Sequence, residues 1–165
     1  MILGVCSDIH DNIWALDRAL PRLAEAEAVI FCGDFCAPFT LVQLAEGVAA
    51  TPVHVVWGNN DGDRWLLTRN AGRFEHVSLH GELAFLELSG LRVGVTHYPE
   101  IAEGLVRSGR YDLVCCGHDH SARHEEVSGC VLLNPGEIMG RFGRSTLAYF
   151  DTATRRVEEV EVERR

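Results

Sequence analysis

The sequence predicts a mixed α/β fold in which two β-sheets pack face to face with helices on the outside. In the first half of the 165-residue chain, short apolar runs alternate with segments of helical periodicity, which is typical of β-α-β units and a mostly parallel sheet. From about residue 74 onward, the chain is a series of short β-rich runs separated by glycine-containing turns. Because no linker, repeat or low-complexity tract interrupts it, we predict a single domain over residues 1–165.

The first half is expected to contain strands and helices in alternation. Its strands are predicted at residues 3–6, 28–32 and 53–57. Asn12 can cap a helix with apolar residues at helical spacing, which Pro21 kinks or shortens. A second helix is expected to begin at Pro38. Trp14 lies in the first of these helices and is expected to belong to the core.

The second half is expected to be mainly β-structure with one short helix at residues 100–108. Its strands are predicted at 75–79, 83–88, 91–96, 113–116, in a hairpin within 123–133, at 145–150 and at 156–162. The segments His80-Gly81-Glu82 and Ser89-Gly90 are interpreted as hairpin turns. The last strand alternates Val and Glu, which suits an edge strand protected from aggregation.

Five of the apolar runs end in polar clusters whose side chains are typical metal ligands. The carboxyl ends of parallel strands meet at one edge of a sheet, so we expect these side chains to converge there. The candidate ligands are Asp8, His10, Asp34, Asn59, His97, His118 and His120.

This mixture of carboxylate, amide and imidazole groups suits Mn²⁺, Fe²⁺, Co²⁺, Ni²⁺ or Zn²⁺, and the lack of thiolates argues against a structural zinc site. Seven ligands are too many for one ion and suit two ions that share a carboxylate. Two such ions, roughly 3.5–4 Å apart, can clamp a phosphoryl group and hold a bridging hydroxide for in-line attack.

The order of these motifs resembles that of the calcineurin-like metallophosphoesterase superfamily, above all its small single-domain prokaryotic phosphodiesterases. The matching motifs are Asp8-x-His10, Gly33-Asp34, Gly58-Asn59-x-Asp61, His97, Gly117-His118-x-His120 and Asn134-Pro135-Gly136. The resemblance implies a four-layer αββα sandwich with the metal site at the carboxyl ends of the strands. It also implies two sets of ligands: Asp8, His10, Asp34 and His120 for one ion, and Asp34 (bridging), Asn59, His97 and His118 for the other.

The resemblance further implies a hydrolase that cleaves phosphodiester bonds with a hydroxide bridging two divalent metals. Mn²⁺ is the first expectation for the metal. We predict that the reaction depends on Asp34, Asn59, Asn60 and Asp61, with Asp61 and Asp119 orienting imidazoles or capping the turns. Two alternatives stay open: a metal-binding scaffold for protein interaction, as in the retromer subunit with this fold, and a phosphomonoesterase or dinucleoside-polyphosphate hydrolase.

Three motifs depart from the pattern of this superfamily. Asn60 stands where many relatives have a His that can protonate the leaving group, and an amide cannot act as an acid near neutral pH. Tyr98-Pro99 replaces the Gly-His that often follows the fourth motif, and Asp11 replaces a Gly in the first. Together these departures predict that an activated or aryl phosphodiester is hydrolysed better than an ester with a poor leaving group.

Composition limits the partners and the location. A formal net charge of −9 argues against broad binding to a nucleic-acid backbone and leaves a small phosphoester as the expected substrate. No apolar stretch is long enough to span a bilayer, and Met1 directly precedes the first strand, so we expect neither a membrane partner nor a signal peptide. Six cysteines without paired C-x-x-C spacing favour reduced thiols in the cytoplasm. The oligomeric state stays open, a homo-oligomer included.

The remaining basic side chains are expected to have ordinary roles. Four histidines outside the motifs are interpreted as structural or solvated: His54, His76, His80 and His124. Arg141 and Arg144, beside two glycines, could reach a substrate phosphate, although a solvated loop is the simpler account.

Overall fold

The structure, a computed structural model, describes residues 1–162; residues 163–165 of the predicted domain lie outside the described part. One sheet, sheet A, contains β1 (Ile2–Cys6), β2 (Ala28–Phe31), β3 (Val53–Val55), β4 (Val77–Leu79), β10 (Thr146–Asp151) and β11 (Val157–Glu161). The other, sheet B, contains β5 (Leu83–Leu88), β6 (Leu91–Thr96), β7 (Leu113–Cys115), β8 (Arg123–Val127) and β9 (Cys130–Asn134). The helices are α1 (Ile13–Leu23), α2 (Pro38–Gly47), α3 (Arg64–Ala71) and α4 (Pro99–Arg107).

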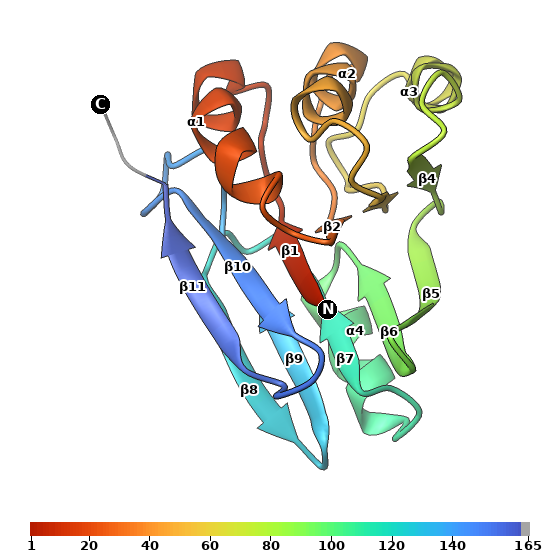
Figure 1. Cartoon of the computed structure of the whole chain (residues 1–165), viewed down its shortest axis with the longest axis vertical. Helices are drawn as coiled ribbons and strands as arrows, with labels where there is room; N and C mark the ends of the chain where they lie inside the picture. Colours follow the sequence, from red (N-terminus) through yellow and green to blue (C-terminus); the bar gives the residue numbers. More distant parts are fainter. Residues whose placement is uncertain (163–165) are drawn as a thin grey trace.

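The elements form four layers, as the sequence predicts. Helices α1, α2 and α3 lie side by side over the outer face of sheet A, and α4 lies against the far face of sheet B (Figure 1). Strand alternation produces these layers, because successive side chains point to opposite faces. In β2, Val29 and Phe31 pack toward the helices, while Ile30 packs between the two sheets. In β7, Leu113 packs between the sheets and Val114 packs under α4.

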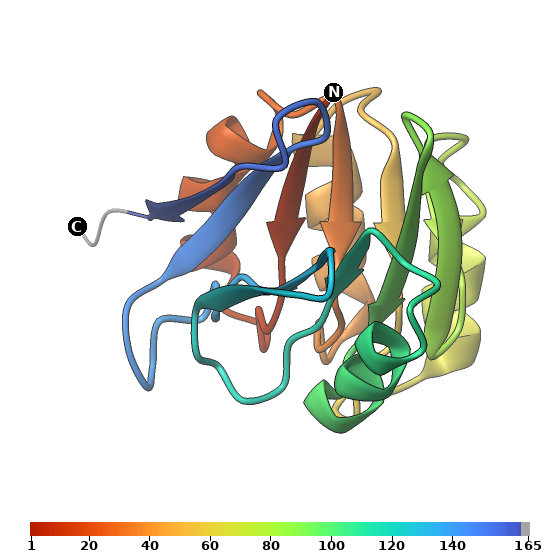
Figure 2. The same cartoon turned by 90° about the horizontal axis from the view of Figure 1, so that it is seen from below.

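The sheets are mixed, and their parallel strands place the site. Sheet A has the order β11-β10-β1-β2-β3-β4, with β1 to β4 parallel to one another. Sheet B has the order β5-β6-β7-β9-β8, with β6, β7 and β9 parallel. The parallel strands of each sheet are seen together in Figure 2. In both sheets, the loops that carry the candidate ligands follow the carboxyl ends of parallel strands.

Two hairpins and one edge strand agree with the sequence prediction. Ser89 and Gly90 form the two-residue turn between β5 and β6, both with positive φ, as the primed turns of hairpins require. Ser128 and Gly129 do the same between β8 and β9. Strand β11 is the edge of sheet A, where its three glutamates face solvent or Arg144.

Three local predictions were wrong or incomplete. Helix α3 was not predicted; it begins after Asp63, whose carboxylate accepts a hydrogen bond from the Leu66 N–H. The segment 80–82 is no hairpin turn, because β4 belongs to sheet A and β5 to sheet B. Trp14 is 68% exposed on α1 and does not belong to the core.

No helix within residues 1–162 is both long and apolar enough to cross a bilayer.

Candidate metal centre

The seven candidate ligands come from both sheets and meet at the edge where the parallel strands end. The loops after β1, β2 and β3 supply the first four, namely Asp8, His10, Asp34 and Asn59. The loops after β6 and β7 supply the other three, namely His97, His118 and His120. The centre is therefore assembled from two separate sheets, which the core between them holds together.

One group of ligands surrounds the Asp8 carboxylate, which is fully buried. The Oδ1 atom of Asp8 lies 3.4 Å from Nε2 of His10 and 3.5 Å from Nε2 of His120. The two imidazole rings stack with their centroids 5.1 Å apart. One ligand atom from each of these three residues lies within 4.8 Å of the others, close enough for a single ion.

The second group lies around Asp34, beside the first. The Oδ2 atom of Asp34 is 3.3 Å from Nε2 of His97 and 3.5 Å from Nε2 of His10, so this oxygen faces both groups. The Oδ1 atom of Asn59 lies 3.0 Å from Nε2 of His97 and 2.9 Å from Nδ1 of His118. Asp34 thus occupies the position between the two groups that a bridging ligand needs.

The polar atoms of the centre fit cations. Among the described residues, Oδ1 of Asp8 and Nε2 of His10 are buried without a hydrogen-bond partner, although buried polar atoms are nearly always paired. Burial by itself would raise the pKa of Asp34, but hydrogen bonding and charge from His97, together with two hydrogen bonds from Asn60, lower it to about 2. An ionised carboxylate between imidazoles, with unpaired atoms aimed at one point, is a suitable cradle for divalent metals.

Five of the seven ligands have a left-handed backbone conformation, which residues other than glycine rarely adopt. Their φ values lie between 46° and 76°, and the residues are Asp8, His10, Asp34, His118 and His120. Backbone hydrogen bonds hold the loops in this state: the N–H groups of Ile9 and His10 both donate to the carbonyl of Asp34. Such local strain gathers at functional sites, where the surrounding structure enforces it.

The far sides of three ligand imidazoles are also fixed by hydrogen bonds. Nδ1 of His97 lies 2.8 Å from the carbonyl oxygen of Cys32, and Nδ1 of His120 lies 2.5 Å from Oε2 of Glu137. Nδ1 of His10 lies 3.4 Å from Sγ of Cys36. Burial, followed by the nearby carboxylates, raises the pKa of the Cys36 thiol to about 12, so it stays protonated as a hydrogen-bond partner. Contacts of this kind orient metal ligands.

Glu137, which is fully buried next to the centre, was not predicted from the sequence. Besides its contact with His120, its Oε1 atom accepts hydrogen bonds from the N–H groups of Phe142 (2.6 Å) and Gly143 (3.0 Å). Glu137 follows Asn134-Pro135-Gly136, and no ligand spacing in the sequence marks it. Its direct succession to that motif was the one available signal.

Asp61 and Asn60 support the loops rather than face the centre as free groups. The Asp61 carboxylate accepts hydrogen bonds from four backbone N–H groups, those of Asp34, Phe35, Cys36 and Gly58. It therefore caps the turns after β2 and β3, one of its two predicted roles, and within residues 1–162 its hydrogen-bond partners are these backbone groups rather than imidazoles. The backbone and side-chain N–H groups of Asn60 both donate to the Asp34 carboxylate, each at a distance of 2.8 Å.

Other polar residues near the centre also act on the loops. Asp11 accepts hydrogen bonds from the Ala37 N–H and the Thr40 hydroxyl, which explains a carboxylate at this position. Asp119 accepts from the Ser121 N–H and the Asn134 amide and pairs with Arg123, so it caps a turn as predicted.

The histidines outside the centre agree with their predicted structural roles. His76 contacts the carbonyl oxygen of Ala45 over 3.0 Å. His54 and His80 form a half-buried pair, with Nδ1 of His54 3.1 Å from Nε2 of His80.

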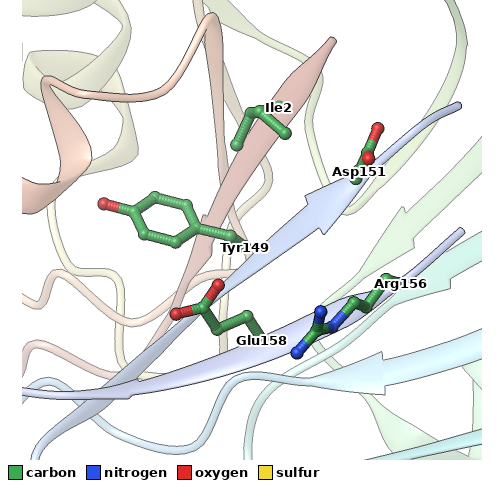
Figure 3. A pocket seen from close by; sticks show the side chains of 5 residues that line it. All are labelled: Ile2, Tyr149, Asp151, Arg156 and Glu158. Atoms are coloured by element: carbon green, nitrogen blue, oxygen red, sulfur yellow. The ribbon is translucent and has the colours of Figure 1, made fainter. Parts of the chain in front are cut away.

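A separate hollow lies at the other end of β1. It is lined by Ile2, Tyr149, Asp151, Arg156 and Glu158, and Figure 3 shows these side chains around it. Ile2 begins β1, whereas the metal ligands follow its last residue. The hollow has none of the imidazoles that mark the candidate centre.

Comparisons with known proteins agree with this geometry. The family model described as the calcineurin-like phosphoesterase superfamily domain matches residues 1–155. The phosphodiesterase MJ0936 of Methanocaldococcus jannaschii is 30% identical over 168 residues, which cover 99% of this chain and all of the relative. The solved structure of an archaeal phosphodiesterase has a TM-score of 0.89 and 29% identity, over 98% of this chain and 99% of that one.

A more distant structural match shows the fold alone. Zinc-bound Vps29 from Entamoeba histolytica has a TM-score of 0.64 and 18% identity, over 99% of this chain and all of that one. The two-sheet architecture is therefore common to proteins named as enzymes and to Vps29, and activity has to be argued from the site.

Proposed function

The chain belongs to the calcineurin-like phosphoesterase superfamily, and from this premise we propose that it is a metal-dependent phosphodiesterase with two divalent cations. Of all the observations, the position of Asp34 Oδ2 between His10 and His97, one imidazole from each ligand group, supports this proposal most directly. One ion would be held by Asp8, His10, Asp34 and His120. The other would be held by Asp34, Asn59, His97 and His118.

Two divalent cations at this site would supply a water of lowered pKa as nucleophile and neutralise charge on the phosphoryl group. The chain's own residues fix that arrangement. Asp34 joins the two ligand groups, and Asn60 holds the Asp34 carboxylate through two hydrogen bonds. Asp61 holds the loops that present Asp34 and Asn59 through four backbone hydrogen bonds. Asp61 is accordingly a positioning residue in this proposal.

A diester of small size is the substrate class that we propose. The full-length relative that is 30% identical to this chain is named as a phosphodiesterase, which supports a diester. Asn60 provides an amide where an acid would assist a poor leaving group, which favours aryl or otherwise activated diesters. Mn²⁺ remains our first choice of metal, with Ni²⁺, Fe²⁺, Co²⁺ and Zn²⁺ as alternatives.

The location that we propose is the cytoplasm. All six cysteines are free thiols, and five of them are buried, which supports a reducing compartment.

The proposal is tested on metal-stripped protein to which Mn²⁺, Ni²⁺ or Zn²⁺ is restored. We expect metal-dependent hydrolysis of bis(p-nitrophenyl) phosphate that exceeds hydrolysis of p-nitrophenyl phosphate. Asp34→Asn should abolish it, because both ligand groups lose their shared charge. Asp17→Asn, at an exposed carboxylate on α1, is the matched control and should keep full activity. Binding of two ions without turnover of either ester would contradict the proposal and favour a metal-binding scaffold for protein interaction.

A further inference from the structure

An exposed aromatic ring stands directly beside the metal centre. Phe142 is 71% exposed, and its ring meets the ring of His120 edge-on, with centroids 5.1 Å apart. Covering the face of an aromatic ring with another apolar surface lowers the free energy, so the exposure of the Phe142 ring is unfavourable in the isolated protein. A substrate held at the centre would bring its ester groups within reach of this ring.

The loop that carries Phe142 is fixed at both ends and by a buried carboxylate. Glu137 and Ser145 form a bridge between the two sides of the loop, and the Ser145 hydroxyl donates to the Ile138 carbonyl over 2.7 Å. The buried Glu137 carboxylate accepts the N–H groups of Phe142 and Gly143 and also contacts His120. One buried group therefore sets the position of a metal ligand and of the aromatic ring together.

The charge around the ring also suits a phosphate ester. The Arg141 guanidinium lies over the Phe142 ring, 5.4 Å from its centroid. This places a positive charge at the rim of a centre in an otherwise acidic chain. Arg144, by contrast, is directed away and pairs with Glu159 and Glu161 on β11. A ring next to a cation matches a substrate in which an aromatic group is attached to a phosphodiester.

We propose that Phe142 forms a subsite for an aromatic ester group of the substrate, an aryl ring or a nucleobase, with Glu137 anchoring the loop. The inference rests on the proposed function and specifies its substrate class. A methyl or other small alkyl ester group would leave the ring uncovered, so the subsite distinguishes diesters by the group that they carry.

The test compares three diesters with the same p-nitrophenolate leaving group and a methyl, phenyl or thymidine 5′ group on the other arm. Phe142→Ala should lower kcat/KM for the phenyl or the thymidine ester about three- to tenfold more than for the methyl ester. Phe142→Trp should restore the preference. Phe85→Ala, at a ring 62% exposed on β5, is the matched control and should change none of the ratios. Comparison of the phenyl and thymidine arms identifies which aromatic group the subsite prefers.

A binding measurement separates this inference from the proposed function. With Mn²⁺-loaded protein, calorimetry compares diphenyl phosphate with dimethyl phosphate. Phe142→Ala should weaken diphenyl phosphate about three- to tenfold and leave dimethyl phosphate unchanged. Turnover of none of the diesters, combined with this binding difference, would refute the phosphodiesterase proposal and keep the subsite. An equal effect of Phe142→Ala on all ligands, or no effect, would overturn the subsite.

Discussion

Replacing Glu137 by Gln exchanges one buried oxygen for an NH₂ group and leaves the volume of the side chain almost unchanged. In the native protein, Oε2 of Glu137 lies 2.5 Å from Nδ1 of His120, and an Nδ1–H that donates to this oxygen is the arrangement that leaves Nε2 able to bind a metal. Nε2 of His120 is then free to face Asp8, 3.5 Å away, as a metal ligand must be. A glutamine NH₂ in the same place donates to Nδ1 and moves the ring proton to Nε2.

The expected loss of metal affinity is about 10- to 100-fold, the range measured for partners that orient metal ligands. This corresponds to about 1.4–2.8 kcal/mol, at about 1.4 kcal/mol for each factor of ten. Only the ion held by Asp8, His10 and His120 should be affected, because the ligand that Glu137 contacts, His120, belongs to this group. The Gln carbonyl oxygen can still accept from the N–H groups of Phe142 and Gly143, so the loop should keep its place.

Isothermal titration of the metal-stripped protein with Mn²⁺ provides the assay, since it resolves two classes of site. Glu137→Gln should weaken one class and leave the other as in the native protein. Glu87→Gln, at an exposed residue of β5, is the matched control. Native affinity for both ions in Glu137→Gln would refute the reasoning, and so would an equal loss at both sites.

Two further predictions use other contacts. Asn60→His should keep both ions bound and raise the turnover of alkyl diesters, by as much as about 100-fold if leaving-group protonation limits the rate. Turnover of p-nitrophenyl esters should change little. An unchanged ratio of alkyl to p-nitrophenyl turnover would exclude a role of leaving-group protonation. Burial lowers the pKa of both His54 and His80, and charge repulsion from His80 lowers that of His54 further. The unfolded chain, with its histidine pKa near 6.5, then binds more protons than the folded one, so the free energy of unfolding falls as the pH drops through this value. Urea denaturation at pH 7.5 and 5.5 should show a smaller fall in the free energy of unfolding for His80→Gln than for the native protein. His124→Gln, at an exposed histidine, should leave this fall unchanged. Equal falls in all three proteins would contradict the role given to the His54–His80 pair.

Much of the fold could be predicted because its signals are local and strong. The strand of residues 28–31 is apolar throughout and is buried on both faces, so composition alone identified it. Ligand pairs such as Asp8 and His10 follow such strands directly, and the geometry of parallel sheets brings their loops to one edge. The resemblance to a known superfamily then added the grouping of the ligands.

The features that sequence reasoning missed depend on packing between distant segments. Helix α3 buries only Leu67 and Ala71 and exposes Trp65, so its apolar periodicity is weak. The turn at 80–82 has the local composition of a hairpin, whether the chain returns within one sheet or crosses to the other. Glu137 became identifiable only when the fold placed it 2.5 Å from a histidine 17 residues away.

The left-handed backbone of the ligand loops sets stability against metal binding. At the five ligand positions with φ between 46° and 76°, a glycine would adopt the conformation with less strain than aspartate or histidine, by about 1 kcal/mol at each position. Substitutions that favour stability alone would therefore dismantle the metal centre one residue at a time. The five positions therefore carry the side chains that a metal centre needs in place of the residue that the backbone conformation favours.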